Sequence, residues 1–358
     1  MFSLVAAGDV LLHQPVLTSA RTDEGYDFTP LLAPTQAWVE GADLALCHLE
    51  VPVAPEGVTP SGYPVFGAPA EIGVGLAAAG WDGCSTASNH SVDRGWNGIV
   101  ATLDALDAAG LGHVGTARSE AEGAQAQWYE LTREGRTIRV AHLSSTYGTN
   151  GIPLPADAPW SVTLLDTDAI VAQASAARDA GADLVLASVH CCVEYVSQAT
   201  QEQQRIAAEL AASGVVDLVI GHHAHVPQPI EKIDGGPRGE GMWVAHGLGN
   251  FISNQDANCC TARTDSGLLL SATFRAPADG PVQVESVGWT AVTVDRSGGH
   301  RVHPVTSLTT RTTAGSLGPD QLAARYGRVA EVVGDQAVER TEPLVPTGAE
   351  PVVVPRTR

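Results

Sequence analysis

The sequence Val215-Val216-Asp217-Leu218-Val219-Ile220-Gly221-His222-His223-Ala224-His225 joins an apolar run to three imidazoles within four positions. The apolar part has the composition of a buried strand, and histidines at the end of a buried strand rarely serve packing. Neutral imidazole is the commonest metal ligand and the usual acid or base near neutral pH. The stretch therefore predicts a strand that ends in a site for metal binding or proton transfer.

Four other apolar segments also end in a polar residue that can bind a metal. The residues that directly follow these segments are Asp9, Glu50, Asn89 with His90, and His190. Amphipathic helices are expected over residues 97–110, 167–180 and 201–212. Strands that alternate with helices in this way predict a parallel sheet covered by helices, and ligands gather at the carboxyl ends of its strands.

The pattern changes beyond about Thr261. Segments of β type follow at 267–274, 282–289 and 290–294, and we expect them to be antiparallel strands that close a second sheet. One late helix is predicted over residues 321–333. The sequence thus favours one domain over residues 1–340, followed by an extended or frayed tail over residues 341–358.

Composition narrows the possible partners. The 358 residues include 20 Lys and Arg against 40 Asp and Glu, a formal net charge of −20, which argues against nucleic acid or an anionic membrane as partner. No apolar run approaches the ~20 residues that span a bilayer, and the N-terminus lacks the basic region of a signal peptide. Because the six cysteines include two adjacent pairs and no C-x-x-C motif, we predict free thiols and a cytoplasmic location.

Taken together, the polar residues at the strand ends resemble the motifs of calcineurin-like metallophosphoesterases, and more closely those of the CapA, or poly-gamma-glutamate capsule-synthesis, branch. The resemblance covers roughly residues 3 to 255. It implies a four-layer α-β-β-α sandwich, in which two central sheets are flanked by helices. The motifs that carry it are Gly8-Asp9-Val10, Leu49-Glu50-Val51-Pro52, Ser88-Asn89-His90, His190, Gly221-His-His-Ala-His225 and Leu248-Gly249-Asn250-Phe251.

This resemblance implies two divalent ions, with Mn, Fe or Zn favoured by the mixed nitrogen and oxygen donors. The ligands it implies are Asp9, Glu50, Asn89, His190, His223 and His225. His222 falls outside the His-x-His spacing and is expected to support the ligands or the structure. His90 is expected to be the general acid, oriented by Asp93 or Glu194.

Close to the expected site, several residues differ from those that the family usually has. The family commonly has Asn at the position of His48, Trp-Gly at Cys191-Cys192 and Tyr-Ser at His246-Gly247, and His13 replaces a small or basic residue. Leu11 stands where typical metallophosphoesterases have a second histidine, which predicts a weakened or empty metal position. The additional imidazoles are predicted to act as acid or base groups, or to tune the ligands.

Three functions follow from these residues. The first is a metal-dependent hydrolase that acts on a phosphoester or on a peptide or γ-glutamyl amide, with peptide, poly-glutamate or phosphoester as substrate. The second is a metal-independent peptide epimerase of the lasso-peptide type, in which Asp9 and one of His90, His223 or His246 move a proton. The third is a non-catalytic assembly protein that keeps only the fold.

Overall fold

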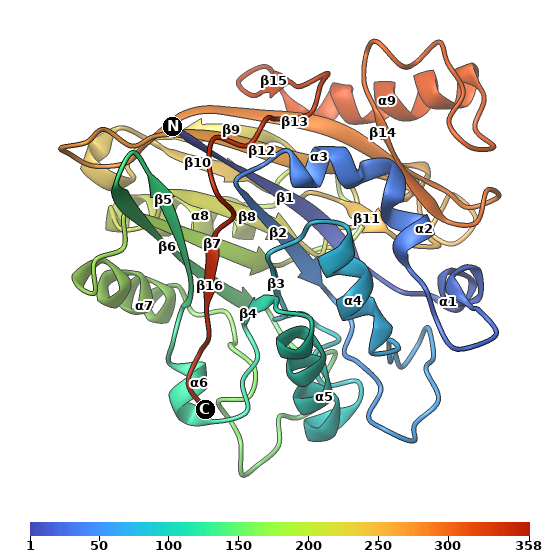
Figure 1. Ribbon diagram of the computed structural model, residues 1–358, viewed down its shortest axis with the longest axis horizontal. Coiled ribbons are helices and arrows are strands. Elements are labelled where there is room, and N and C mark those ends of the chain that lie inside the picture. Colours follow the sequence, from blue (N-terminus) through green and yellow to red (C-terminus); the bar gives the residue numbers. More distant parts are fainter.

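Two β-sheets lie face to face at the centre of the molecule, and helices cover their outer faces (Figure 1). The computed structural model describes residues 1–358. The first sheet has nine strands: β1 (Phe2–Val10), β2 (Leu44–Leu49), β3 (Gly83–Ser85), β4 (Gly112–Val114), β11 (Asn250–Ile252), β12 (Ser266–Arg275), β13 (Gln283–Asp295), β14 (Arg301–Val305) and β15 (Val338–Glu339). Its main order is β14-β13-β12-β1-β2-β3-β4, with β11 paired to β1 and β15 paired to β13.

The second sheet has seven strands, in the order β16-β5-β6-β7-β8-β10-β9. These strands are β5 (Gln127–Arg133), β6 (Arg136–Thr146), β7 (Leu184–His190), β8 (Leu218–His222), β9 (Ile230–Ile233), β10 (Met242–Ala245) and β16 (Val352–Val354). In this sheet β6, β7, β8 and β10 run parallel, as β1 to β4 do in the first. The carboxyl ends of each parallel set therefore lie at one edge of its sheet.

Most helices lie in the two outer layers. The helices are α1 (Gln14–Ala20), α2 (Thr29–Leu32), α3 (Gln36–Glu40), α4 (Glu71–Ala78), α5 (Gly95–Ala108), α6 (Glu120–Gly123), α7 (Thr167–Asp179), α8 (Gln201–Ser213) and α9 (Pro319–Val333). Of these, α9 packs on the inner face of the first sheet, because its Leu322, Val329 and Val333 belong to the core between the sheets. Three short 3-10 helices cover Ala33–Thr35, Pro237–Gly239 and Ala262–Asp265. The predicted helices over 97–110, 167–180 and 201–212 are confirmed as α5, α7 and α8, and the one over 321–333 as α9.

Side-chain alternation in β1 shows how the layers pack. Leu4 and Ala6 belong to the apolar core between the two sheets, whereas Val5 and Ala7 belong to the core beneath helices α1 to α4. A third core joins the outer face of the second sheet to α7 and α8. Because successive residues of a strand face opposite sides, one apolar strand can serve two cores. These three cores between four layers confirm the predicted α-β-β-α sandwich.

The late β segments occupy a different place from the one predicted. They were expected to close a second sheet, but β12 pairs antiparallel with β1, and β13 and β14 continue outward in the first sheet. Residues 283–295 also form one long strand rather than two. The pattern of apolar residues shows which side chains are buried, but not which strand each segment pairs with. Because β2 pairs with one edge of β1, the other edge is available to β12.

The C-terminal segment is held along the second sheet. Within residues 341–358, which were expected to be extended or frayed, β16 pairs antiparallel with β5. The buried Arg356 guanidinium donates hydrogen bonds to the backbone oxygens of Thr116 at 2.8 Å and Glu122 at 3.0 Å. This segment is thus fixed by a strand pairing and by a buried cation rather than frayed.

The prediction of free thiols is wrong. Cys47 and Cys84 are register partners on the neighbouring strands β2 and β3, and they form a disulfide with a Cα–Cα distance of 4.4 Å. Two further disulfides join Cys191 to Cys192 and Cys259 to Cys260. Residues 37 positions apart meet only because of the parallel pairing, which the spacing of the cysteines does not reveal.

No helix in the structure combines the length and the apolar character needed to cross a bilayer.

Asp82 gives a prediction about stability away from the site. Its carboxylate accepts the Ala45 N–H at 2.7 Å, and burial raises its pKa to about 7. An acid whose pKa is raised on folding destabilises the protein increasingly as pH rises from the unfolded to the folded pKa. Asp82→Asn keeps an acceptor and is expected to raise the free energy of unfolding by about 4 kcal/mol at pH 8, with little effect near pH 4. Urea unfolding across this range measures it, and a gain independent of pH contradicts it.

Candidate metal centre

The carboxyl ends of strands from both sheets meet at one place. Asp9 lies near the end of β1, with His48 beside it on β2 and Asn250 on β11. From the second sheet, His190 is the last residue of β7 and His222 the last of β8. The structure thus brings together polar residues that are up to about 240 positions apart in the chain.

Two glycines allow this close approach. A Cβ atom on Gly8 would lie 1.9 Å from the backbone oxygen of Gly249, and one on Gly221 would lie 1.9 Å from that of His246. Any side chain at either position would push the strand ends apart. Each glycine directly precedes the polar residue that its strand presents.

Asp9, His225 and Glu50 form one continuous group. The Asp9 carboxylate lies 3.0 Å from His225 Nδ1, and the other ring nitrogen, Nε2, lies 3.6 Å from Glu50 Oε1. Asn250 Oδ1 contacts the same Nδ1 at 3.1 Å. His225 has a positive φ of 56°, a conformation uncommon outside glycine that is often found at functional sites.

The group continues from Glu50 to the other predicted ligands. His190 Nε2 lies 4.0 Å from Glu50 Oε1 and 2.8 Å from Asn89 Oδ1. The ring of His223 lies 4.7 Å from that of His190, and it too has a positive φ, of 82°. All six residues that the resemblance implied as ligands therefore lie in one cluster with Glu50 at its centre.

The two carboxylates at this centre are buried without donors. Asp9 and Glu50 are both 0% exposed, and none of their four oxygens receives a well-aligned hydrogen bond. Burying a carboxylate without hydrogen bonds or a counter-charge is costly. Two further features fit the cluster to divalent ions: its mixture of imidazole nitrogens and carboxylate oxygens suits Mn, Fe or Zn, and Asp9, Glu50 and His225 present donor atoms within 4.8 Å of one another.

Protonation in the centre follows from burial and from the mutual charges. Burial raises the pKa of the Glu50 carboxyl well above its usual value. Burial acts in the same direction on Asp9, but the contacts with His222 and His225 outweigh it and hold the pKa of Asp9 well below its usual value. Burial alone would lower the pKa of His225, whereas Glu50 and Asp9 together raise it to about 9. Without metal, His225 is thus the cation that balances Asp9.

His90 is held at the side of the centre by Asp93. Its Nδ1 lies 2.8 Å from Asp93 Oδ2, and that oxygen also accepts the Phe66 N–H at 2.8 Å. The ring packs edge-on against Phe66, with 4.7 Å between the ring centroids. These contacts fix the ring and leave Nε2 as the nitrogen without a protein partner.

Other residues singled out in the sequence lie apart or at the rim. His246 Nε2 contacts Glu231 at 2.8 Å, and the residue lines a small cavity between the second sheet and α8. Glu194, which was a candidate to orient His90, approaches His225 instead, at 3.9 Å. The imidazoles within 4 Å of the Asp9 carboxylate belong to His222 and His225, whereas the candidates to act with Asp9 in an epimerase were His90, His223 and His246.

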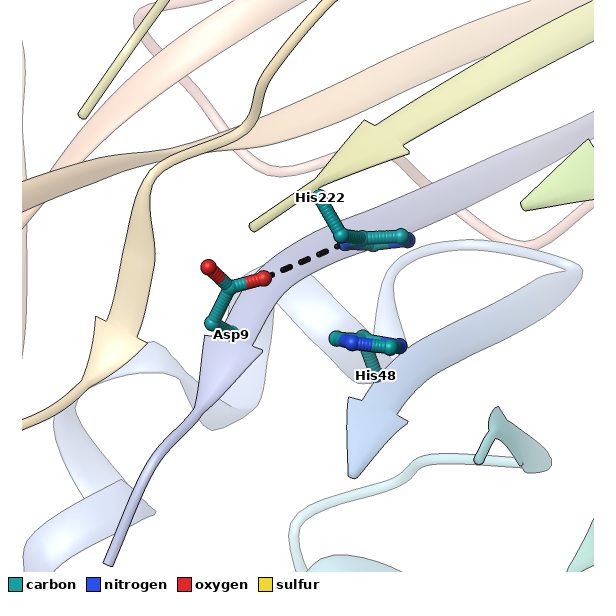
Figure 2. A group of neighbouring side chains, drawn as sticks. All are labelled: Asp9, His48 and His222. Carbon is teal, nitrogen blue, oxygen red and sulfur yellow. Dashed lines mark ion pairs between the residues drawn. The ribbon is translucent and has the colours of Figure 1, made fainter. Parts of the chain in front are cut away.

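Sequence reasoning missed the part of the cluster that Figure 2 shows, in which Asp9 points to His222 and the rings of His222 and His48 are stacked. The signal was the alternation within each strand. Every second residue of a strand faces the same side. In β8, Leu218 and Ile220 face the other sheet, and His222 follows them on that side. In β2, Leu44 and Leu46 place His48 on the inner face in the same way. The His-x-His spacing indicates His223 and His225 as ligands and leaves out His222, which lies on the face toward the other sheet.

The family model described as "Bacterial capsule synthesis protein PGA_cap" matches residues 3–255, and the chain belongs to this family. The matched range contains every residue that was expected to be a metal ligand, and the two-sheet sandwich agrees with the fold that the resemblance implied.

Particular relatives agree with this assignment. The chain is 28% identical over 195 residues to the capsule biosynthesis protein CapA of Bacillus anthracis, which covers 53% of this chain and 44% of the relative. It is 28% identical over 185 residues to the PGA biosynthesis protein CapA of Bacillus subtilis, covering 52% and 45%. The chain thus matches less than half the length of these relatives. The NAD nucleotidase of Haemophilus influenzae shares the fold at a TM-score of 0.52 and 13% identity, over 91% of this chain and 66% of that one.

Proposed function

We propose that this protein is a divalent-metal-dependent hydrolase that cleaves a γ-glutamyl or other peptide amide, or a phosphoester. The observation that carries the proposal is the buried pair Asp9 and Glu50, whose four oxygens lack donors while imidazoles surround them. Two carboxylates for which His225 can balance only one charge are costly in a binding surface or a scaffold, and they have a use in a metal centre.

The residues divide into two sets that share Glu50. Asp9 and His225 would hold one ion, and Asn89, His190 and His223 would hold the other. Divalent ions held by these residues would lower the pKa of a water molecule and neutralise charge that develops at phosphorus or at a carbonyl oxygen. The protein's own part is to fix the donors, which it does through buried strand ends and through the close approach at Gly8 and Gly221.

His90 supplies the proton for the leaving group in this proposal. His90 Nδ1 donates a hydrogen bond to Asp93, which orients the ring and turns Nε2 to the substrate, and the imidazolium form would then transfer its Nε2 proton to the leaving group. Asp93 is itself fixed by the backbone N–H of Phe66, so the pair cannot easily rotate away. The His90 imidazole, fixed by the Asp93 carboxylate, thus has the geometry of a general acid with an orienting carboxylate.

The names of the relatives favour one substrate class. Both CapA relatives are named for capsule or PGA biosynthesis, which supports a γ-glutamyl amide as the first substrate to assay. A phosphoester is the second, because the fold is shared with a nucleotidase.

Removal of metal tests the proposal. The purified protein is expected to contain two divalent ions per chain, to lose at least ~100-fold in activity after dialysis against a chelator, and to recover it with Mn²⁺, Fe²⁺ or Zn²⁺. Metal analysis and assays with γ-glutamyl peptides and aryl phosphates measure this. A protein without stoichiometric metal contradicts the proposal. Deuterium uptake at a peptide α-carbon that survives chelation would support the epimerase instead, and full metal loading without turnover would support an assembly role.

A further inference from the structure

His222 is placed between the two sheets, next to Asp9 (Figure 2). It is the last residue of β8, and it follows Leu218 and Ile220 on the face that packs against the first sheet. Its side chain is 2% exposed. Neither ring nitrogen has a hydrogen-bond partner, although buried polar atoms are nearly always paired.

The distance from His222 to Asp9 suits a shared cation better than a hydrogen bond. His222 Nδ1 lies 3.4 Å from Asp9 Oδ1, beyond the ~2.7–3.2 Å of an N–H···O hydrogen bond. Two ligands of one tetrahedral Zn²⁺, with bonds of about 2.1 Å, lie about 3.4 Å apart. The Asp9 oxygen at this contact also lacks an aligned donor.

His48 fixes the orientation of the His222 ring. The two rings stack with 3.9 Å between their centroids and an angle of 15° between their planes (Figure 2). His48 is itself held at both nitrogens, by Ser85 Oγ at 2.8 Å and by His190 Nδ1 at 2.9 Å. Because both of its nitrogens are engaged, His48 can position its neighbour but has no nitrogen free to bind an ion.

We propose that His222 is a metal ligand, that its Nδ1 and Asp9 Oδ1 bind the same divalent cation, and that His48 is a positioning residue that holds the imidazole by stacking. This inference rests on the proposed function and adds a ligand to its first metal position. Asp9, His48 and His222 present donor atoms within 4.8 Å of one another, and Asp9 belongs to a second such group with Glu50 and His225. Asp9 therefore stands where imidazole nitrogens and carboxylate oxygens meet, a mixture of donors that suits Zn²⁺.

His222→Phe separates a ligand from a structural ring, because phenylalanine keeps the stack on His48 and removes both nitrogens. With Zn²⁺ as the probe, the wild-type protein is expected to bind two ions per chain. The variant is expected to bind one of them at least ~10-fold more weakly and to keep the other. Its metal-free form should stay folded with stability close to that of the wild type, because the loss of two unpartnered buried nitrogens offsets the loss of one of the two imidazole contacts that hold the Asp9 carboxylate ionised. Zn²⁺ titration against a competing chelator and thermal unfolding measure these effects.

His142→Phe is the matched control. His142 is also fully buried on a strand of the second sheet and also has an unpartnered Nδ1, but no carboxylate lies within 4 Å of it. This variant should bind two Zn²⁺ ions with wild-type affinity. If His222→Phe unfolds, the smaller change His222→Gln replaces it, with the absorption spectrum of the Co²⁺-loaded protein as a second readout.

The outcomes separate the two claims. If the wild type binds two ions and a folded His222 variant binds both with unchanged affinity and an unchanged Co²⁺ spectrum, the inference is overturned and the proposed function stands. If the wild type binds no Zn²⁺, the proposed function fails and the inference fails with it. Selective loss of one ion in the His222 variant, with the His142 control unaffected, supports the inference.

Discussion

Glu50→Gln is expected to remove catalytic activity and at the same time to stabilise the metal-free protein. Glu50 lies between the two sets of predicted ligands, with His225 3.6 Å and His190 4.0 Å from the same oxygen. An uncharged amide cannot bridge two cations, so we expect metal content to fall below one ion per chain and kcat to fall at least ~1000-fold. In the metal-free protein, burial opposes ionisation of the Glu50 carboxyl. Replacing this carboxyl with an amide is therefore expected to raise the free energy of unfolding of the metal-free variant by about 1 kcal/mol at pH 8.

Glu231→Gln is the control for this variant. Glu231 is also a glutamate in contact with a histidine, since it lies 2.8 Å from His246 Nε2, but that pair is outside the cluster. It should keep wild-type metal content and kcat. Metal analysis, steady-state kinetics and urea unfolding of both variants decide the matter. If Glu50→Gln retained two ions and full activity, Glu50 would not be a bridging ligand.

His90→Asn is expected to lower kcat about 10²- to 10⁴-fold while leaving metal content unchanged. The imidazole is proposed to protonate the leaving group, and it is bound by Asp93 rather than by the carboxylates of the cluster. The loss should therefore depend on the leaving group. A substrate with an activated leaving group, such as a nitrophenol, needs little protonation and should lose far less than an alkyl ester or an amide.

His246→Asn provides the comparison for His90. His246 was also a candidate acid in the sequence, but the structure pairs it with Glu231, and we expect its variant to keep kcat within about twofold. Equal losses on good and poor leaving groups in His90→Asn would argue that His90 shapes the site rather than donating a proton. A loss of bound metal in the same variant would point to a role in ligand placement.

Much of the fold and of the site was readable from the sequence because the signals are local. Apolar runs such as 184–189 and 215–220 marked buried strands, and the polar residue after each run marked its carboxyl end. Parallel strands then bring these ends to one edge whatever the details of packing. The six predicted ligands were found together for this reason, since each was identified by its own strand.

The residues that were missed or misplaced depend on contacts between distant segments. His246 follows an apolar segment, as the other candidates do, yet it meets Glu231 instead of the cluster. Cys47 and Cys84 meet because β2 pairs with β3 in one particular register. The late strands joined the first sheet because an edge of β1 was open. None of these contacts can be predicted from the sequence pattern of either contacting segment alone.

By itself, the sequence determined the kinds of donor, their order along the chain and their position at the ends of buried strands, because strand composition and alternation are properties of a few neighbouring residues. Only the tertiary structure decided which donors face one another. Two sheets had to pack face to face before His222 could lie against His48 and next to Asp9, and before the oxygens of Asp9 and Glu50 were buried without hydrogen-bond donors. Burial and the distances between strands far apart in sequence set that arrangement, and they exist only in the folded chain.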